Sequence, residues 1–154
     1  MAVTASQVKE LREITGLGMM ECKQALVEVD GDQEAAIDLL RKKAGAKVEK
    51  KSARTAAEGA ISISVEGSGK IAAIVEVNSE TDFVAKGDEF QGFANQIAQT
   101  IVEQNPADLE ALAGMELSGA SNTVEKTREA LVAKLGENII IKRFVRFQLG
   151  EKVN

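Results

Sequence analysis

The hydrophobic pattern of the chain changes its period near residue 54, and this change limits the fold more than any other feature. Before it, apolar residues recur every three or four positions, which is typical of amphipathic helices. After it, residues 61–65 alternate apolar with polar side chains, and a β-branched run over 71–77 follows a Gly-Ser-Gly turn. We therefore expect two modules, a helical one over residues 1–53 and an α+β one over residues 54–154.

Three short helices account for the first module. Residues 4–7 have the form of a capping box, and Gly16 is a natural stop for the first helix. The second helix is expected to begin after Gly18, and the third after Asp32, whose carboxylate can cap it. The residues expected to face the core are Val8, Leu11 and Ile14 in the first helix, Cys22, Ala25, Leu26 and Val29 in the second, and Ala36, Ile37, Leu39 and Leu40 in the third.

A basic stretch separates the two modules. From Arg41 to Arg54 the chain has seven Lys or Arg and one Glu, with little apolar content after Leu40. We expect the end of the third helix to run into a solvated linker here. A weak RNA-binding tail is the alternative, and it is disfavoured because no aromatic residues interleave to stack on bases.

The second module is expected to follow the order ββααβ. Apolar residues at helical spacing predict helices over 88–103 and 124–135, and Pro106 is placed at the first position of a short helical turn between them. A third strand is predicted over 139–149. It most simply joins the hairpin as a three-stranded antiparallel sheet with helices on one face.

Phe83 lies in the polar turn between the second strand and the helix that follows. The chain has no Trp, no Tyr and only five Phe, so each aromatic side chain needs an explanation. Phe83 precedes Phe90 by seven residues and would join the same apolar stripe if the helix began earlier, although Gly87 weakens such a helix by roughly 1 kcal/mol. Otherwise Phe83 is an exposed anchor beside Asp82, and its burial in a partner is worth about 1.5–3 kcal/mol.

Composition excludes several functional classes. A single cysteine, Cys22, and the absence of His rule out disulfides, zinc clusters and Ser-His or Cys-His catalysis. The net charge of −5 is concentrated after residue 54, which disfavours nucleic acid as a direct partner. No apolar run is long enough to span a membrane, and the first thirty residues lack a secretory pattern. We expect a cytoplasmic protein without cofactor, bound metal or membrane partner.

Met19 and Met20 stand at the turn between the first two helices. Two adjacent helical residues cannot both face one core, so at least one is expected to be exposed. A flexible Met can fill a gap in a small core, or it can offer a soft contact to a partner helix. Lys9 and Arg12 lie outside the apolar stripe of the first helix, where they would be solvated or would rim such a contact.

Three blocks of sequence resemble the signatures of bacterial translation elongation factor Ts. They are residues 11–26, residues 76–86 with Thr81-Asp82-Phe83-Val84-Ala85-Lys86, and residues 133–139, and they occur in the family's order. The resemblance implies a guanine nucleotide exchange factor for elongation factor Tu in protein biosynthesis, not an enzyme. It also implies an N-terminal module similar to ubiquitin-associated three-helix domains, followed by an α+β core subdomain.

The resemblance also implies roles for particular residues. In the family a turn enters the G domain of elongation factor Tu, in its GDP-bound and nucleotide-free forms, and disturbs the magnesium site; the matching residues are Thr81, Asp82, Phe83 and Val84. N-terminal positions that rest against a helix of the G domain match Lys9, Arg12, Met19 and Met20. Gly87 departs from the family, where a polar residue is common, and it is expected to loosen the turn.

Other expectations follow from length and from competing interpretations. Many relatives continue with a second core subdomain and a C-terminal helical module, so this chain is either a short form that dimerises through strand 139–149 or a fragment. One alternative function is a module that captures a helical or ubiquitin-like partner through Leu17, Met19 and Met20 without exchange activity. Another is an enzyme with an acid/base cluster of Glu76, Glu80 and Asp82.

Overall fold

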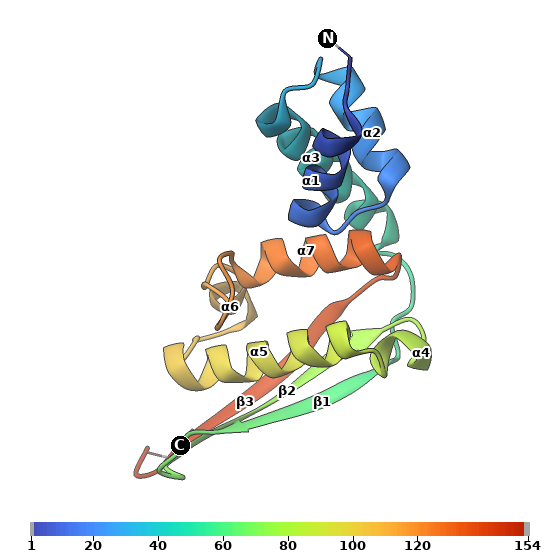
Figure 1. Ribbon diagram of the computed structural model, residues 1–154. Helices are drawn as coiled ribbons and strands as arrows, with labels where there is room; N and C mark the ends of the chain where they lie inside the picture. Colours follow the sequence, from blue (N-terminus) through green and yellow to red (C-terminus); the bar gives the residue numbers. More distant parts are fainter. Residues whose placement is uncertain (1, 153–154) are drawn as a thin grey trace. The chain divides into compact units, whose positions relative to one another are not determined.

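The computed structural model describes residues 2–152, which divide into two compact units (Figure 1). The first unit holds the chain up to Ala53 together with Glu129–Gly136, and the second holds Arg54–Arg128 and the chain from Glu137. The α+β class is confirmed: three N-terminal helices precede a three-stranded antiparallel sheet with helices. The elements are α1 Ala5–Thr15, α2 Met19–Glu28, α3 Gln33–Lys51, β1 Glu58–Val65, β2 Ile71–Ser79, α4 Asp82–Ala85, α5 Asp88–Gln104, α6 Leu109–Ala113, α7 Val124–Leu135 and β3 Ile140–Gln148.

Side-chain caps begin the helices of the first unit as the sequence predicts. Gln7 N donates to Thr4 Oγ1 at 3.2 Å, and Thr4 N donates to Gln7 Oε1 at 2.9 Å, so the capping box is complete. Ala35 N donates to Asp32 Oδ1 at 3.1 Å at the start of α3. Gly16 ends α1 in the left-handed region at φ 70°, where a side chain would be strained. The buried cluster consists of Val8, Leu11, Cys22, Ala25, Leu26, Ala36 and Leu40.

Two expectations for the first unit were wrong. Ile14 is 56% exposed. Each step of three residues, from Val8 to Leu11 and from Leu11 to Ile14, falls about 60° short of a full helical turn, so Ile14 lies about 120° from Val8 around α1. The basic stretch is not a linker, since α3 continues to Lys51. Buried Val48 and an ion pair between Lys43 Nζ and Glu28 Oε1 at 3.1 Å anchor this extension.

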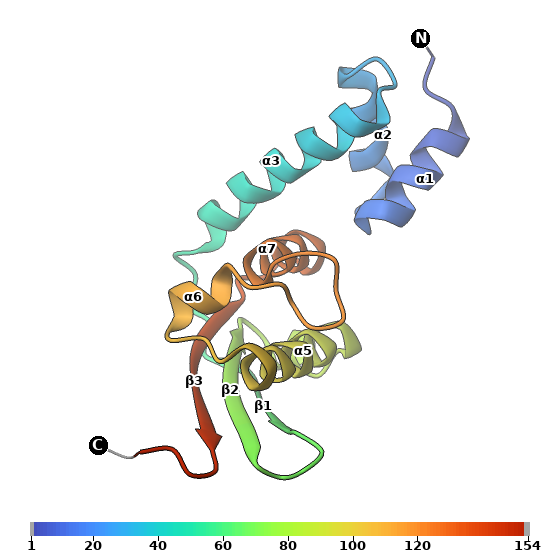
Figure 2. The same cartoon turned by 90° about the vertical axis from the view of Figure 1, so that its left-hand side faces the viewer.

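The sheet of the second unit has the strand order β1-β2-β3, with both pairs antiparallel. Helix α5 packs against β1 and β2, as Figures 1 and 2 show. The contact is apolar: Val75 and Val77 on β2 are fully buried, as are Phe90 and Ile97 on α5. A bulge between Glu76 and Val77 shifts the β2–β3 register.

The opposite face of the sheet is apolar and exposed. Successive side chains of a strand point to opposite faces of the sheet, so this face has the residues that do not point toward α5. The middle row of this face has one residue from each strand: Ile63 of β1 pairs with Ile74 of β2, and Ile74 pairs with Val145 of β3. The large apolar side chains exposed there are Ile61, Ile63, Val65, Ile74, Val145 and Phe147.

Helix α4 adds to the expected ββααβ order, and the short helical turn expected after Asn105 is present as α6. Pro106 does not open α6, because Asp108 caps that helix by accepting from Ala111 N at 2.8 Å, and α6 begins at Leu109. Asn105 ends α5 in a left-handed conformation instead. No helix within residues 2–152 combines the length and the apolar content that crossing a membrane requires.

Candidate functional site

Strand β2 ends in a turn at one end of the sheet. Its last residue, Ser79, is fully buried, and Ser79 Oγ donates to Thr81 O at 2.9 Å. Thr81 then caps α4, and its Oγ1 accepts from Val84 N at 3.3 Å. The rigid strand and the cap together fix where the turn begins.

The far end of the turn is fixed as well. Ala85 is buried, and its carbonyl accepts from Gln91 Nε2 on α5 at 2.6 Å. Gly87 N donates to Val84 O at 3.0 Å, and Gly87 adopts an ordinary φ of −69° at the start of α5. A Cβ at position 87 would lie 3.3 Å from Val84 O, so a larger residue fits only with a small shift of the backbone.

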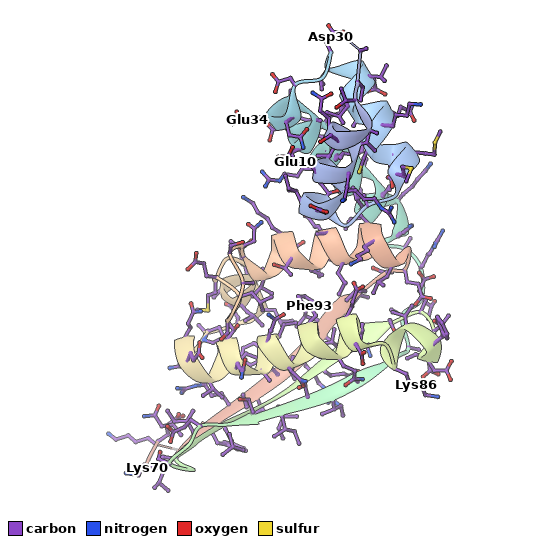
Figure 3. The ribbon with its side chains drawn as sticks, viewed as in Figure 1. Glu10, Asp30, Glu34, Lys70, Lys86 and Phe93 are labelled. Atoms are coloured by element: carbon purple, nitrogen blue, oxygen red, sulfur yellow. The ribbon has the colours of Figure 1, made fainter. Side chains whose placement is uncertain are left out.

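Between these two anchors the turn presents Phe83 to solvent. The Phe83 side chain is 84% exposed, which confirms that it does not belong to the core. Asp82 and Thr81 are also exposed, whereas Val84 is half-buried. Asp82 Oδ2 lies 3.4 Å from Lys86 Nζ, and Lys86 projects from the α4 end of the unit (Figure 3). This exposed ion pair contributes little stability, so it can be replaced by contacts with a partner.

A segment 56 residues further along the chain holds the entrance of the turn. Glu137 Oε1 accepts from Glu80 N at 3.1 Å and from Thr81 N at 3.0 Å, and Glu137 Oε2 accepts from Thr81 Oγ1 at 2.7 Å. Asn138 N donates in return to Glu80 Oε2 at 2.7 Å. Glu137 lies in the block 133–139, which resembles the family but whose sequence indicates no role. Spacing along the chain carries no signal of this contact.

The second set of candidate residues lies on the first unit. Lys9, Arg12 and Met19 line one groove of about 500 Å³, together with Val3, Thr4, Ala5, Val8 and Lys23. Apolar side chains form its floor, and Lys9, Arg12 and Lys23 give it a basic rim. Met20 is 75% exposed but does not line the groove. Both methionines of the pair are therefore at the surface, and only Met19 shares the groove with Lys9 and Arg12.

The three carboxylates considered for catalysis do not form a cluster. Glu76 is paired with Arg143, with 2.8 Å between Oε1 and Nε, while Glu80 binds Asn138 and Asp82 binds Lys86. Hydrogen bonds from the Asn78 amide and from Arg143 lower the pKa of Glu76 below its ordinary value. A general acid at neutral pH needs a raised pKa, so this arrangement does not support acid/base chemistry.

Comparison with known proteins places the chain among translation factors. A family model described as "Elongation factor TS" matches residues 80–154, which include the turn and the Glu137 segment. Elongation factor Ts of Arthrospira platensis is 59% identical over 142 residues, which are 92% of this chain and 57% of the relative. Elongation factor Ts of Thioalkalivibrio sulfidiphilus is 53% identical over 148 residues, 96% of this chain and 50% of the relative.

A third relative extends the match to almost the whole chain. Elongation factor Ts of Hydrogenovibrio crunogenus is 50% identical over 162 aligned residues, which cover 99% of this chain and 55% of the relative. The chain thus spans about half the length of the curated relatives it matches. Since alignments with 50% identity or more extend over both units, and the family model covers the exposed turn, the chain belongs to the elongation factor Ts family.

Proposed function

We propose that the chain is a guanine nucleotide exchange factor for elongation factor Tu. The turn Thr81-Asp82-Phe83-Val84 enters the G domain near its magnesium site and promotes release of GDP. The single observation that carries the proposal is the 84% exposure of Phe83 on a turn anchored at both ends. Exposing an apolar ring to water costs free energy, which burial in a partner would recover. Because the backbone of the turn is already fixed, little conformational entropy is lost when the ring inserts.

The mechanism requires no covalent chemistry. Mg²⁺ demands near-ideal octahedral geometry and bridges the nucleotide phosphates, so displacing the residues around it removes much of the GDP affinity. Phe83 acts as the wedge, and Asp82 orients the turn or perturbs the metal's surroundings. Because the coupling is reciprocal, each tenfold loss of GDP affinity, about 1.4 kcal/mol, is matched by a tenfold loss of factor affinity when GDP is bound.

A second contact is proposed through the groove of the first unit. Its apolar floor and basic rim suit an amphipathic helix with acidic residues along one side. Met19 adapts to the apolar side of such a helix, and Met20 extends the soft surface beyond the groove. Lys9 and Arg12 would guide the approach by electrostatic attraction. This contact supplies affinity, whereas the turn supplies exchange.

The proposal is tested by stopped-flow release of fluorescent GDP from magnesium-loaded elongation factor Tu. The parent chain is expected to accelerate release, and Phe83→Ala to lose at least tenfold of that acceleration, because the lost ring is worth about 1.5–3 kcal/mol. Leu109→Ala is the matched control, since it removes a 40% exposed apolar side chain outside the proposed surfaces.

The same experiment separates the alternative function. A folded parent chain that binds elongation factor Tu without accelerating release would be a partner-binding module, as the groove alone would allow. Equal acceleration by the parent and by Phe83→Ala would remove the wedge from the mechanism.

Self-association is a further part of the proposal. The outer face of the sheet exposes a contiguous apolar surface centred on Ile63, Ile74 and Val145. Monomeric proteins rarely leave such a surface in water. A second copy of the chain, packed sheet against sheet, would cover it with matching apolar side chains.

A further inference from the structure

The carboxylate of Glu137 holds the backbone at which the exposed turn begins. We propose that Glu137 is a positioning residue for nucleotide exchange: it fixes Thr81 so that α4 forms and Phe83 stays presented in one orientation. This inference rests on the proposed exchange function. The three hydrogen bonds that Glu137 accepts come from Glu80 and Thr81, so it acts on Phe83 through this part of the chain.

The geometry is that of a charged clamp. One oxygen of Glu137 accepts from two successive backbone N–H groups, of Glu80 at 3.1 Å and of Thr81 at 3.0 Å, and the other accepts from the Thr81 hydroxyl at 2.7 Å. Hydrogen bonds to an ionised acceptor are stronger than neutral ones. Three of them on adjacent groups restrict both the position and the rotation of the chain at Thr81.

The clamp is reciprocal. Asn138 N donates to the carboxylate of Glu80 at 2.7 Å, so each segment supplies a carboxylate to the backbone of the other. Asn138 is 2% exposed, and its Nδ2 donates to Arg54 O at 2.9 Å. Arg54 lies 3.6 Å from the Glu80 carboxylate and closes the network. The clamp is therefore supported by the buried side chain of Asn138, although Glu137 itself lies nearer the surface.

The hydroxyl of Thr81 links the clamp to the turn. Because this hydroxyl donates its hydrogen to Glu137, its lone pairs are directed to accept from Val84 N at 3.3 Å. Helix α4 has only four residues and cannot form from propensity alone. Its cap adds to the backbone hydrogen bonds from Ala85 N to Thr81 O and from Lys86 N to Asp82 O, and together they shape the chain on both sides of Phe83.

Loss of the clamp should lower the rate of exchange more than the affinity for the partner. Without Glu137 the turn would sample other conformations, and only the fraction with the correct geometry could insert Phe83. A tenfold fall of that fraction, about 1.4 kcal/mol, is a modest demand on three lost charge-assisted hydrogen bonds. The groove of the first unit would still bind.

The first test is independent of exchange activity. Amide hydrogen exchange of the free chain, followed by NMR, is compared for the parent, Glu137→Ala and the control Glu110→Ala, which removes an exposed carboxylate on α6. We expect the amides of Glu80 and Thr81 to exchange about tenfold faster in Glu137→Ala, and those of Val75 and Val77 to stay unchanged. Unchanged protection at Glu80 and Thr81 would overturn the inference.

The second test separates positioning from general stability. In a titration of GDP release, Glu137→Ala should lower the maximal rate about tenfold while the half-saturating concentration changes less than twofold. The double variant Phe83→Ala/Glu137→Ala should be no slower than Phe83→Ala, because Glu137 acts through that ring. Additive losses, or an unchanged maximal rate, would overturn the inference.

A milder variant covers the case in which Glu137→Ala does not fold. Glu137→Gln keeps an oxygen for the two backbone N–H groups but loses the charge, so it should retain an intermediate maximal rate. A rate equal to that of the parent would show that the charge is unnecessary and would overturn the clamp as described. If the folded parent does not accelerate release at all, the proposed function fails and the positioning role falls with it. Amide exchange then still decides whether Glu137 holds the turn.

Discussion

Phe83 and Phe90 show how residue spacing and structure differ at the scale of single side chains. They are seven positions apart, yet Phe83 is 84% exposed and Phe90 is fully buried. The difference arises at Gly87, whose extended ψ of 147° separates α4 from α5 and so breaks the helical phase between the two rings. The sequence suggested this break but could not decide it, because a glycine is tolerated inside a helix at a cost of about 1 kcal/mol.

A cross-strand ion pair should make stability depend on pH in a defined direction. Glu76 and Arg143 are register partners on β2 and β3, and hydrogen bonds from Asn78 and Arg143 hold the pKa of Glu76 below its ordinary value. The stabilisation is therefore complete above the pKa of the unfolded chain, about 4.3, and it is lost as pH falls through the lower folded pKa.

Urea unfolding of the parent and Glu76→Gln, followed by circular dichroism, measures this contribution. We expect Glu76→Gln to be less stable than the parent at pH 7, and the difference to shrink near pH 3. Other carboxylates titrate equally in both proteins and cancel in the comparison. A difference that is the same at both pH values would contradict the assignment.

At the scale of elements, local rules predicted the caps of α1 and α3 but not the length of α3. Thr4 and Asp32 cap α1 and α3 as expected, because a side-chain cap is encoded within four residues. The continuation of α3 to Lys51 was missed, since it depends on Val48 finding a buried place and on Lys43 meeting Glu28 of α2. The clamp by Glu137 was missed for the same reason: its partners are 56 and 57 residues away.

Helix α3 can be stabilised at Gly45. This glycine lies inside the helix, and a Cβ there would meet no atom within 4 Å. Gly45→Ala should raise the free energy of unfolding by roughly 1 kcal/mol, because alanine loses less backbone entropy and favours the helix. Thermal unfolding followed by circular dichroism at 222 nm checks it.

Gly69→Ala is a matched control for that prediction. A Cβ at Gly69 also meets open space, but the residue has a φ of +74° in the hairpin turn. The same substitution should therefore destabilise by about 1–2 kcal/mol through backbone strain alone. Equal effects at the two glycines would show that backbone conformation does not control them.

At the scale of the whole molecule, the chain offers three surfaces with different chemistry. The groove of the first unit is apolar with a basic rim, the turn presents one aromatic ring, and the outer face of the sheet is broadly apolar. The sequence predicted the turn and the residues around the groove, largely by resemblance. It also predicted strand alternation and helices on one face of the sheet, which leaves the large apolar side chains of the other face exposed in the described part of the second unit.

The outer sheet face should mediate self-association that a single charge can abolish. Ile63 is 64% exposed on edge strand β1 and is the register partner of Ile74, so Ile63→Lys places a charge in the middle of the proposed interface without removing a core side chain. Burying an unpaired charge costs several kcal/mol, enough to dissociate a dimer of moderate affinity.

Sedimentation equilibrium of the parent over a range of concentrations should show a mass rising from 16.4 kDa toward twice that value, and Ile63→Lys should remain at 16.4 kDa. Ser68→Lys adds the same charge in the hairpin turn of β1 and β2, where Ser68 is exposed outside the face, and should associate like the parent. A parent that stays monomeric at all concentrations, or a Ser68→Lys variant that dissociates equally, would contradict association through this face. Because Phe83 lies outside the face, a monomeric but folded Ile63→Lys should keep the parent's maximal rate of GDP release if one turn is sufficient for exchange.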